Sequence, residues 1–106
     1  MKIALIGYGK MGKAIEETAI DKGDAVALKI SSSNKDAFTT ESLAPADVAI
    51  EFTNPESAVD NIKKCFDANI PVVCGTTGWL QRWDEVVNYC NAKNGTFLYA
   101  SNFSVG

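Results

Sequence analysis

Residues 3–12 read Ile3-Ala4-Leu5-Ile6-Gly7-Tyr8-Gly9-Lys10-Met11-Gly12, an apolar run followed by three glycines in the spacing G-x-G-x-x-G. A short, continuous apolar run is typical of a strand that is buried on both faces of a parallel sheet. After it, one helical stripe collects Met11, Ala14, Ile15, Thr18 and Ala19, while Lys13, Glu16, Glu17 and Asp21 lie largely opposite. The glycines therefore occupy a strand-to-helix turn, the context in which this spacing binds the pyrophosphate of a dinucleotide.

Each of the three glycines has a separate role in such a turn. Gly7 permits the tight turn, Gly9 lets the backbone approach a pyrophosphate, and Gly12 lets helix and strand pack closely. The N-terminus of the following helix adds free amides and the positive end of its dipole. Residues 1–35 hold six basic and four acidic residues within a chain of formal charge −3, which favours an anionic ligand at this end. A purely structural glycine-rich turn is the alternative interpretation.

Short apolar runs and amphipathic stretches alternate along the rest of the chain. We expect five strands, over residues 3–6, 25–30, 48–52, 72–74 and 96–100. Three crossover helices are expected over residues 11–22, 55–69 and 80–93, with stops at Gly23 and at Asn94-Gly95 and a start at Asn54-Pro55. The polar stretch 31–46 is expected to be a loop with room for a short turn. This alternation predicts an α/β domain with a doubly wound parallel sheet, a Rossmann-type dinucleotide-binding domain.

Length and composition limit the classes of function. The 106 residues fit one small domain, and 46% hydrophobic residues argue against disorder. Mild acidity argues against a nucleic-acid partner. The chain has no histidine, so it lacks the commonest acid–base group and every histidine-containing zinc site. We therefore expect no catalytic residue and no metal site within this domain.

Cysteine usage and the absence of long apolar runs bear on the compartment. The chain has three cysteines, Cys65, Cys74 and Cys90. Their odd number and the lack of a Cys-x-x-Cys spacing favour reduced, mostly buried thiols. The apolar run at the N-terminus is too short for a signal peptide, and no window approaches the ~20 apolar residues of a membrane span. The sequence thus predicts a cytoplasmic protein without membrane contact.

The end of the second expected strand addresses the identity of the cofactor. NAD-binding domains often place an acid there to bind the ribose 2′-hydroxyl, but this strand ends Leu28-Lys29-Ile30-Ser31-Ser32. A lysine among hydroxyls suits a 2′-phosphate, and Lys10 in the glycine loop could assist. We therefore expect NADP(H) to bind at least as well as NAD(H). The alternative is that Lys29 points to solvent.

Two further segments follow strands directly. In Glu51-Phe52-Thr53-Asn54-Pro55, Phe52 and Thr53 are candidates to line a nicotinamide or ribose pocket, and Thr53 or Asn54 caps the next helix. Glu51 ends a buried strand and is interpreted as a structural hydrogen-bond acceptor. In Gly75-Thr76-Thr77-Gly78, glycines flank two hydroxyls, as a ribose or nicotinamide site would require, although a plain turn is the alternative. Trp79 and Trp83 are expected to be packing residues.

Together with the tail Ala100-Ser101-Asn102-Phe103-Ser104-Val105-Gly106, these motifs resemble the N-terminal domain of the 4-hydroxy-tetrahydrodipicolinate reductase (dihydrodipicolinate reductase) family, over essentially the whole chain. The resemblance implies that the pyrophosphate is held by Gly7, Tyr8, Gly9, Lys10, Met11 and Gly12. It implies that Lys29 and Ile30 contact the adenosine ribose, and that Gly75, Thr76 and Thr77 contact the nicotinamide half. It also implies that Ala100, Ser101, Asn102 and Phe103 line the side of hydride transfer.

The chain also departs from the family pattern. Lysine stands at position 29 where the family has its usual acid, and Glu51 stands where the family has Asp. The family has a second domain with paired histidines, a lysine acid, a dicarboxylate-binding loop and the homotetramer interface. None of these is found in residues 1–106, which are expected to be the dinucleotide-binding domain alone.

The resemblance implies an oxidoreductase that reduces hydroxy-tetrahydrodipicolinate to tetrahydrodipicolinate with NAD(P)H, in diaminopimelate and lysine biosynthesis. This chain is expected to bind the cofactor without turnover. Two other interpretations stay open: a non-catalytic dinucleotide-sensing module, and the cofactor domain of another amino-acid-pathway dehydrogenase, such as an aspartate or homoserine dehydrogenase. The tail 102–106 weighs against the sensing module, and the segments 75–78 and 101–106 weigh against another dehydrogenase.

Overall fold

The computed structural model describes residues 1–99 and contains one parallel sheet. Its strands are β1 (Lys2–Ile6), β2 (Ala25–Ile30), β3 (Val48–Glu51), β4 (Val72–Cys74) and β5 (Phe97–Tyr99), in the order β2-β1-β3-β4-β5. The chain starts at β1, moves to the β2 edge, and returns across β1 to β3. The strand order therefore reverses between β1 and β3, and a ligand site is expected at the carboxyl ends of these two strands. The predicted doubly wound sheet is confirmed.

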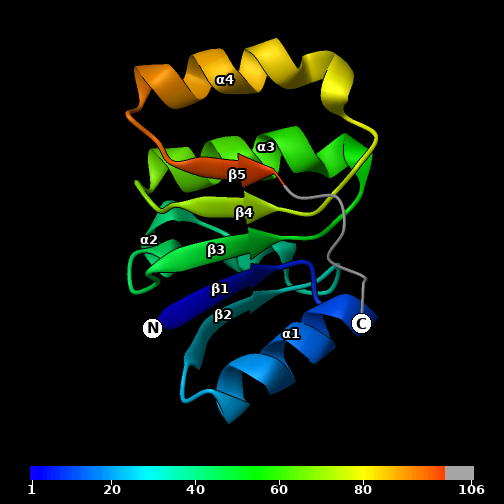
Figure 1. Cartoon of the computed structure of the whole chain (residues 1–106), viewed down its shortest axis with the longest axis vertical. Coiled ribbons are helices and arrows are strands. Elements are labelled where there is room, and N and C mark those ends of the chain that lie inside the picture. The colour runs from blue at the N-terminus through cyan, green and yellow to red at the C-terminus, as the bar shows by residue number, and fades with distance from the viewer. Residues whose placement is uncertain (100–106) are drawn as a thin grey trace.

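The helices cover both faces of this sheet. They are α1 (Lys10–Asp21), α2 (Thr40–Leu43), α3 (Pro55–Asp67) and α4 (Trp83–Ala92), with 3₁₀ turns η1 (Lys35–Ala37) and η2 (Leu80–Arg82). In Figure 1, α3 and α4 lie toward the β5 edge and α1 lies beside β2. Helix α1 packs on one face of the sheet, and α2, α3 and α4 contribute to the core on the other. Within residues 1–99, no helix has the length and apolar character needed to cross a bilayer.

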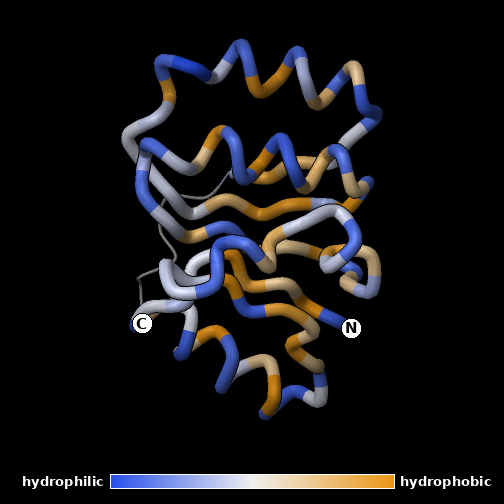
Figure 2. Tube along the Cα trace, turned by 180° about the vertical axis from the view of Figure 1, so that it is seen from behind, coloured by the Kyte–Doolittle hydropathy of each residue, from blue (hydrophilic) through white to orange (hydrophobic). Residues whose placement is uncertain are grey.

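Strand β1 is buried on both faces, as its continuous apolar run predicts. Ala4 and Ile6 point into the larger core with α3, whereas Ile3 and Leu5 point toward α1. In Figure 2, hydrophobic residues are concentrated in the central strands, and hydrophobic and hydrophilic colours alternate along the helices. The glycine-rich loop after β1 is therefore anchored to the most buried strand of the sheet.

Three helices end in the same way, at a residue with positive φ. These residues are Gly23 after α1, Asn69 after α3 and Asn94 after α4, with φ of 86°, 58° and 52°. Glycine and asparagine are the residues that adopt this left-handed conformation most readily. The predicted stops at Gly23 and at Asn94-Gly95 are confirmed.

The start of α3 is also confirmed, because the Asn54 side chain accepts a hydrogen bond from the Ser57 amide at 3.0 Å and Pro55 begins the helix. Asn54 rather than Thr53 is the capping residue.

Two expectations about the helices need correction. Ala14 and Thr18 were expected on the buried stripe of α1 but are exposed, whereas Glu16 is half-buried. The reason is that α1 packs against the sheet through Gly12, Ile15 and Ala19, a stripe rotated from the predicted one.

The stretch 31–46 is more ordered than a loop with one turn. It contains η1 and the four-residue α2, whose N-terminus is fixed by reciprocal Thr39 and Ser42 hydrogen bonds, and it buries Phe38 and Leu43 in the larger core. The fifth strand, β5, begins at Phe97, one residue later than expected, and is described as far as Tyr99; the expected end at residue 100 lies outside the described residues.

Candidate cofactor site

The loops that follow β1, β2, β3 and β4 are joined by backbone hydrogen bonds beyond the carboxyl edge of the sheet. The Gly7 amide donates to the Ile30 carbonyl at 2.8 Å, and the Phe52 amide donates to the Ile6 carbonyl at 2.7 Å. The Gly75 amide donates to the Glu51 carbonyl at 2.9 Å. The segments that the sequence singled out therefore lie side by side at the point where the strand order reverses.

Two of the loop glycines are required by the fold itself. Gly7 has φ +104°, and a Cβ added there would lie 2.0 Å from the Phe52 carbonyl oxygen. A Cβ added at Gly12 would lie 2.7 Å from the Gly7 carbonyl oxygen. Real Cβ atoms do not approach backbone so closely, so any side chain at either position would force the loop apart. The tight turn at Gly7 and the close packing at Gly12 agree with their predicted roles.

Gly9 differs from both, because a Cβ added to it meets no atom of the chain within 4 Å. Its φ of −106° also lies outside the left-handed region that favours glycine. Gly9 stands at the N-cap of the twelve-residue helix α1, which has no side-chain cap and no acid in its first turn. The free amides and the positive end of the helix dipole therefore face outward beside a glycine that the fold does not require.

A cavity of about 490 Å³ opens beside this loop. Its volume is in the range of small-molecule sites. The lining residues are Ile6, Gly7, Tyr8, Gly9, Ile30, Ser31, Ser32, Lys35, Phe38, Thr53, Asn54, Ser57, Asn61 and Lys64. Among the predicted site residues, the structure brings Gly7, Tyr8, Gly9, Ile30 and Thr53 together around this space.

The other predicted residues do not line this cavity. Lys10 is exposed at the start of α1, Met11 is half-buried in its first turn, and Phe52 is half-buried beside Thr53. Gly75 and Thr76 are buried, while Thr77 is exposed. Ala100, Ser101, Asn102 and Phe103 lie outside the described residues.

Part of the cavity wall was missed by sequence reasoning. Asn54, Ser57, Asn61 and Lys64 line it from the start of α3 onward, at a spacing of three and four residues. That polar stripe at helical spacing was readable in the sequence and could have identified them.

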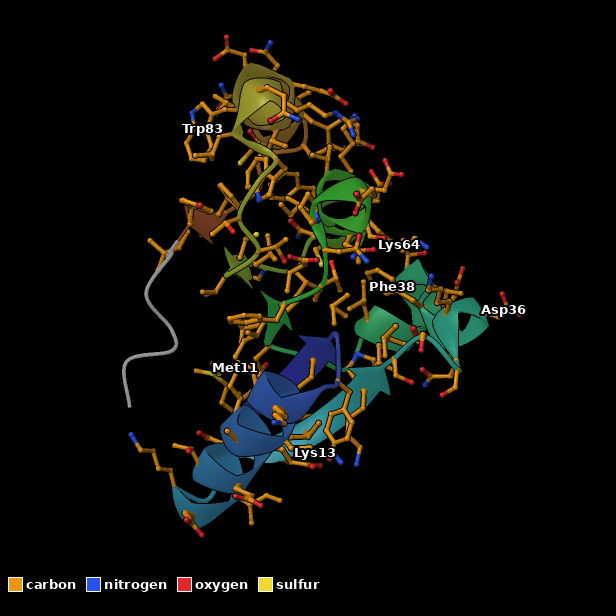
Figure 3. All side chains as sticks on the ribbon, turned by 90° about the vertical axis from the view of Figure 1, so that its right-hand side faces the viewer. Met11, Lys13, Asp36, Phe38, Lys64 and Trp83 are labelled. Carbon is orange, nitrogen blue, oxygen red and sulfur yellow. The ribbon has the colours of Figure 1, made fainter. Side chains whose placement is uncertain are left out.

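Lys64 also connects α3 to the segment before α2. Its Nζ donates to the Phe38 carbonyl at 2.8 Å and lies 4.6 Å from the centre of the Phe38 ring. Figure 3 shows Lys64 and Phe38 next to each other, with Met11 of α1 on the other side of the sheet. The polar stretch 31–46 thereby forms one wall of the cavity, which its composition did not reveal.

Lys29 is held at the glycine loop by two partners. Its Nζ lies 3.0 Å from Glu16 Oε2 and 5.1 Å from the centre of the Tyr8 ring, and the Tyr8 hydroxyl donates to Glu16. A register shift in the β1–β2 pairing, with Ile3 opposite Val26 and Ala4 opposite Leu28, inserts one extra residue in β2. This bulge brings Lys29 onto the same face as α1.

The contacts among these three residues shift their titration. The hydrogen bond from Tyr8 and then the bond to Lys29 lower the pKa of Glu16, while Glu16 raises the pKa of Lys29. Glu16 and Lys29 therefore form an ion pair next to the cavity, and the Tyr8 hydroxyl donates a hydrogen bond to Glu16. Glu16 is the residue of this group that the sequence did not single out, because its half-buried position depends on the rotation of α1.

Thr76 does not present its hydroxyl to the site. The side chain is 4% exposed, and its Oγ1 accepts from the Thr53 amide at 2.8 Å while donating to Glu51 Oε1 at 2.6 Å. The interpretation of Glu51 as a buried hydrogen-bond acceptor is confirmed. Trp79 is 1% exposed and stacks on Trp83 with their ring centres 5.7 Å apart, as expected of packing residues. Trp83 remains 37% exposed.

The cysteines and the acidic residues form no metal site among residues 1–99. No group of three or more Cys, Asp or Glu in this range could hold a metal ion. Cys65 and Cys74 are buried, and desolvation raises the pKa of each thiol to about 12. Neither thiol has the lowered pKa of a nucleophile.

Comparison with known proteins identifies the family. The family described as "Dihydrodipicolinate reductase, N-terminus" matches residues 1–103. A 4-hydroxy-tetrahydrodipicolinate reductase of Christiangramia forsetii is 43% identical over 108 residues, covering 100% of this chain and 44% of the relative. The reductase of Neisseria meningitidis serogroup A is 35% identical over 128 residues, covering 100% of this chain and 47% of the relative. The chain thus spans less than half the length of these relatives.

Solved structures with the same fold bind nicotinamide dinucleotides. An NAD-binding protein from Listeria innocua aligns with TM-score 0.71 and 17% identity, over 95% of this chain and 35% of the other. A hyperthermophilic archaeal homoserine dehydrogenase in complex with NADPH aligns with TM-score 0.68 and 14% identity, over 94% and 43%. At such identities they establish the fold alone, so the family comes from the sequence match. The chain belongs to the dihydrodipicolinate reductase family, of which it matches the N-terminal region.

Proposed function

We propose that this chain is the NAD(P)H-binding part of a reductase that converts hydroxy-tetrahydrodipicolinate to tetrahydrodipicolinate in cytoplasmic diaminopimelate and lysine biosynthesis. The names of the relatives and the family match support this assignment. The observation that carries it is Gly9, where the fold leaves open space beside the uncapped N-terminus of α1. A glycine without a structural reason is explained by a ligand that approaches the backbone there.

In this proposal, each half of the cofactor has its own residues. The glycine loop, residues 7–12, holds the pyrophosphate with the amides at the start of α1. The cavity between Tyr8, Ile30 and Thr53 takes the adenosine half. Phe52, Gly75, Thr76 and Thr77, together with Ala100, Ser101, Asn102 and Phe103, contact the nicotinamide half. The cofactor, when bound, supplies the hydride.

NADPH is proposed to bind at least as well as NADH. The residues that end β2 and follow it include no acid up to residue 35; Ser31, Ser32 and Lys35 line the cavity, and Lys29 lies close to the glycine loop. Hydroxyls and ammonium groups are suitable partners for a 2′-phosphate. Fluorescence titration with both cofactors at low salt tests the ranking, and clearly tighter NADH binding would contradict it.

The part of the relatives that this chain does not match is proposed to contain the family's second domain. The acid–base groups, the substrate-binding loop and the homotetramer interface are proposed to belong there. The residues described here would then bind and orient the cofactor, with no acid–base group of their own in the reaction.

The substitution Gly9→Ala tests the assignment. It should leave the melting temperature within about 3 °C of the wild type, since the added Cβ meets no atom of the chain. It should weaken NADPH binding about tenfold or more, because the methyl group occupies the space proposed for the pyrophosphate. Ala14→Ser, an exposed change on the same helix, is the matched control. Unchanged NADPH affinity in a folded Gly9→Ala protein would contradict the proposed site.

A further inference from the structure

Glu51 is a fully buried carboxylate (0% exposed) at the end of β3, beneath the candidate site. Its Oε1 accepts from Thr76 Oγ1 at 2.6 Å and from Cys74 Sγ at 3.3 Å. Its Oε2 accepts from Asn61 Nδ2 at 3.0 Å and from the Thr53 hydroxyl. Neither oxygen has a lysine or arginine partner among residues 1–99.

The donors to Glu51 come from three different parts of the site. Thr53 follows β3 and lines the cavity, as does Asn61 of α3. Cys74 ends β4, and Thr76 belongs to the turn 75–77 that is proposed to meet the nicotinamide half. One carboxylate therefore joins the wall of the adenosine-side cavity to the nicotinamide-side turn.

The Thr76 hydroxyl takes part in this connection both as an acceptor and as a donor. It accepts from the Thr53 amide at 2.8 Å and donates to Glu51 at 2.6 Å, so its proton and one of its two lone pairs are committed. If either loop moved, a buried carboxylate oxygen would lose a donor. Leaving a buried polar oxygen without a hydrogen-bond donor is unfavourable, so the network resists such a movement.

From this geometry we infer that Glu51 is a positioning residue that holds the turn 75–77 in a fixed place relative to the adenosine-side cavity. The inference rests on the proposed function for its ligand. It assigns Glu51 a role in aligning the two halves of the site, with no contact between its carboxylate and the cofactor.

The test compares Glu51→Gln with Glu41→Gln, a control that removes the same charge from an exposed position on α2. The two probes are NADPH and adenosine 2′,5′-bisphosphate, which lacks the nicotinamide half. Glu51→Gln should weaken NADPH binding about tenfold and leave the bisphosphate affinity within about twofold, since Thr53 and Asn61 of the cavity wall keep their mutual hydrogen bond at 3.2 Å, whereas the Thr76 hydroxyl loses its carboxylate acceptor. Equal losses for both ligands would indicate a general structural role and would overturn the inference, as would unchanged NADPH affinity.

Thr76 supplies a second, independent test from the other end of the network. Thr76→Val keeps the shape but removes the hydroxyl, and it should reproduce the selective loss of NADPH affinity. Thr76→Ser keeps the hydroxyl and should restore most of that affinity. A Val variant that binds NADPH as the Ser variant does would overturn the inference, whether or not Glu51→Gln folds.

Amide hydrogen exchange gives a measurement that needs no cofactor. In Glu51→Gln, the amide of Thr53 should exchange about tenfold faster or more, because its acceptor Thr76 loses its own partner, while amides of β1 keep their rates. Unchanged exchange at Thr53 would refute the positioning role. Failure of the wild-type chain to bind NADPH would instead count against the proposed function, so the two failures are distinguishable.

Discussion

At the scale of single residues, the Tyr8–Glu16–Lys29 group bears on the choice between the two cofactors. Lys29 lies near the glycine loop, but Glu16 neutralises its charge at 3.0 Å. The Lys29 side chain is 47% exposed and that of Glu16 is 18% exposed, so the pair is only partly screened by solvent. Glu16 thereby reduces the positive potential available to a 2′-phosphate.

Replacing Glu16 with Gln should shift the preference toward NADPH. The change leaves the Lys29 charge uncompensated, so the ratio of NADPH to NADH affinity should rise about threefold at low salt, the size expected for a partly exposed ion pair. Glu17→Gln, the neighbouring exposed acid, is the matched control for net charge. Titrations of both cofactors measure the ratio, and equal ratios in the two variants would show that Glu16 does not act on Lys29.

The thiols give a second prediction at this scale. Because burial raises the pKa of Cys65 and Cys74 to about 12, neither is a thiolate at neutral pH, and both are sealed in the larger core. We expect a disulfide-exchange reagent to label the half-buried Cys90 in the native chain, and all three thiols only in denaturant. Cys90→Ser should abolish the native labelling. Rapid labelling that persists in this variant would show that the core opens readily.

At the scale of elements, Glu85 of α4 forms an ion pair that links α4 to α3. It pairs with Arg82 at 2.8 Å and with Lys63 of α3. The Arg82 and then the Lys63 hydrogen bonds lower the pKa of Glu85 from 4.5 to about 2. A carboxyl whose pKa is lower in the folded state stabilises that state above its unfolded pKa, and this stabilisation disappears as the pH falls from about 4.5 toward 2.

Glu85→Gln should therefore flatten the acid side of the stability profile. The drop in melting temperature between about pH 5 and pH 2.5 should be smaller than in the wild type, since the variant has no such group to protonate. Glu41→Gln, which changes an exposed acid without an ion pair among residues 1–99, should keep the wild-type drop. Melting curves across this range measure it, and parallel profiles for wild type and Glu85→Gln would contradict the role of the pair.

Elements with strong local signals were predictable from the sequence. The apolar run of β1, the helix stops at Gly23 and Asn94, and the Asn54 cap each depend on neighbours in the chain, and each is present in the structure. Helix α2 was not predictable, because four residues carry little helical periodicity. Its Thr39–Ser42 capping pair also differs from the usual pattern with Glu or Gln.

The candidate site likewise has parts that could be predicted from the sequence and parts that could not. The glycine loop and the segments after β3 and β4 were predictable, since parallel strands bring the segments that follow them to one edge. The pairing of Glu16 with Lys29 was not, because it depends on the rotation of α1 and on the bulge in β2. The commitment of Thr76 to Glu51 depends on burial, which the order of residues does not reveal.

At the scale of the whole molecule, these residues are expected to bind NADPH and to turn over no substrate. The chain contains no histidine and matches 44% of the length of its Christiangramia forsetii relative, and the acid–base groups are proposed to lie in the part of the relative that it does not match. Titration should show saturable NADPH binding, while a steady-state assay with hydroxy-tetrahydrodipicolinate generated in situ should show no NADPH oxidation above background. The full-length relative is the positive control. Turnover approaching that of the relative would mean that side chains within these 106 residues complete the reaction without histidine.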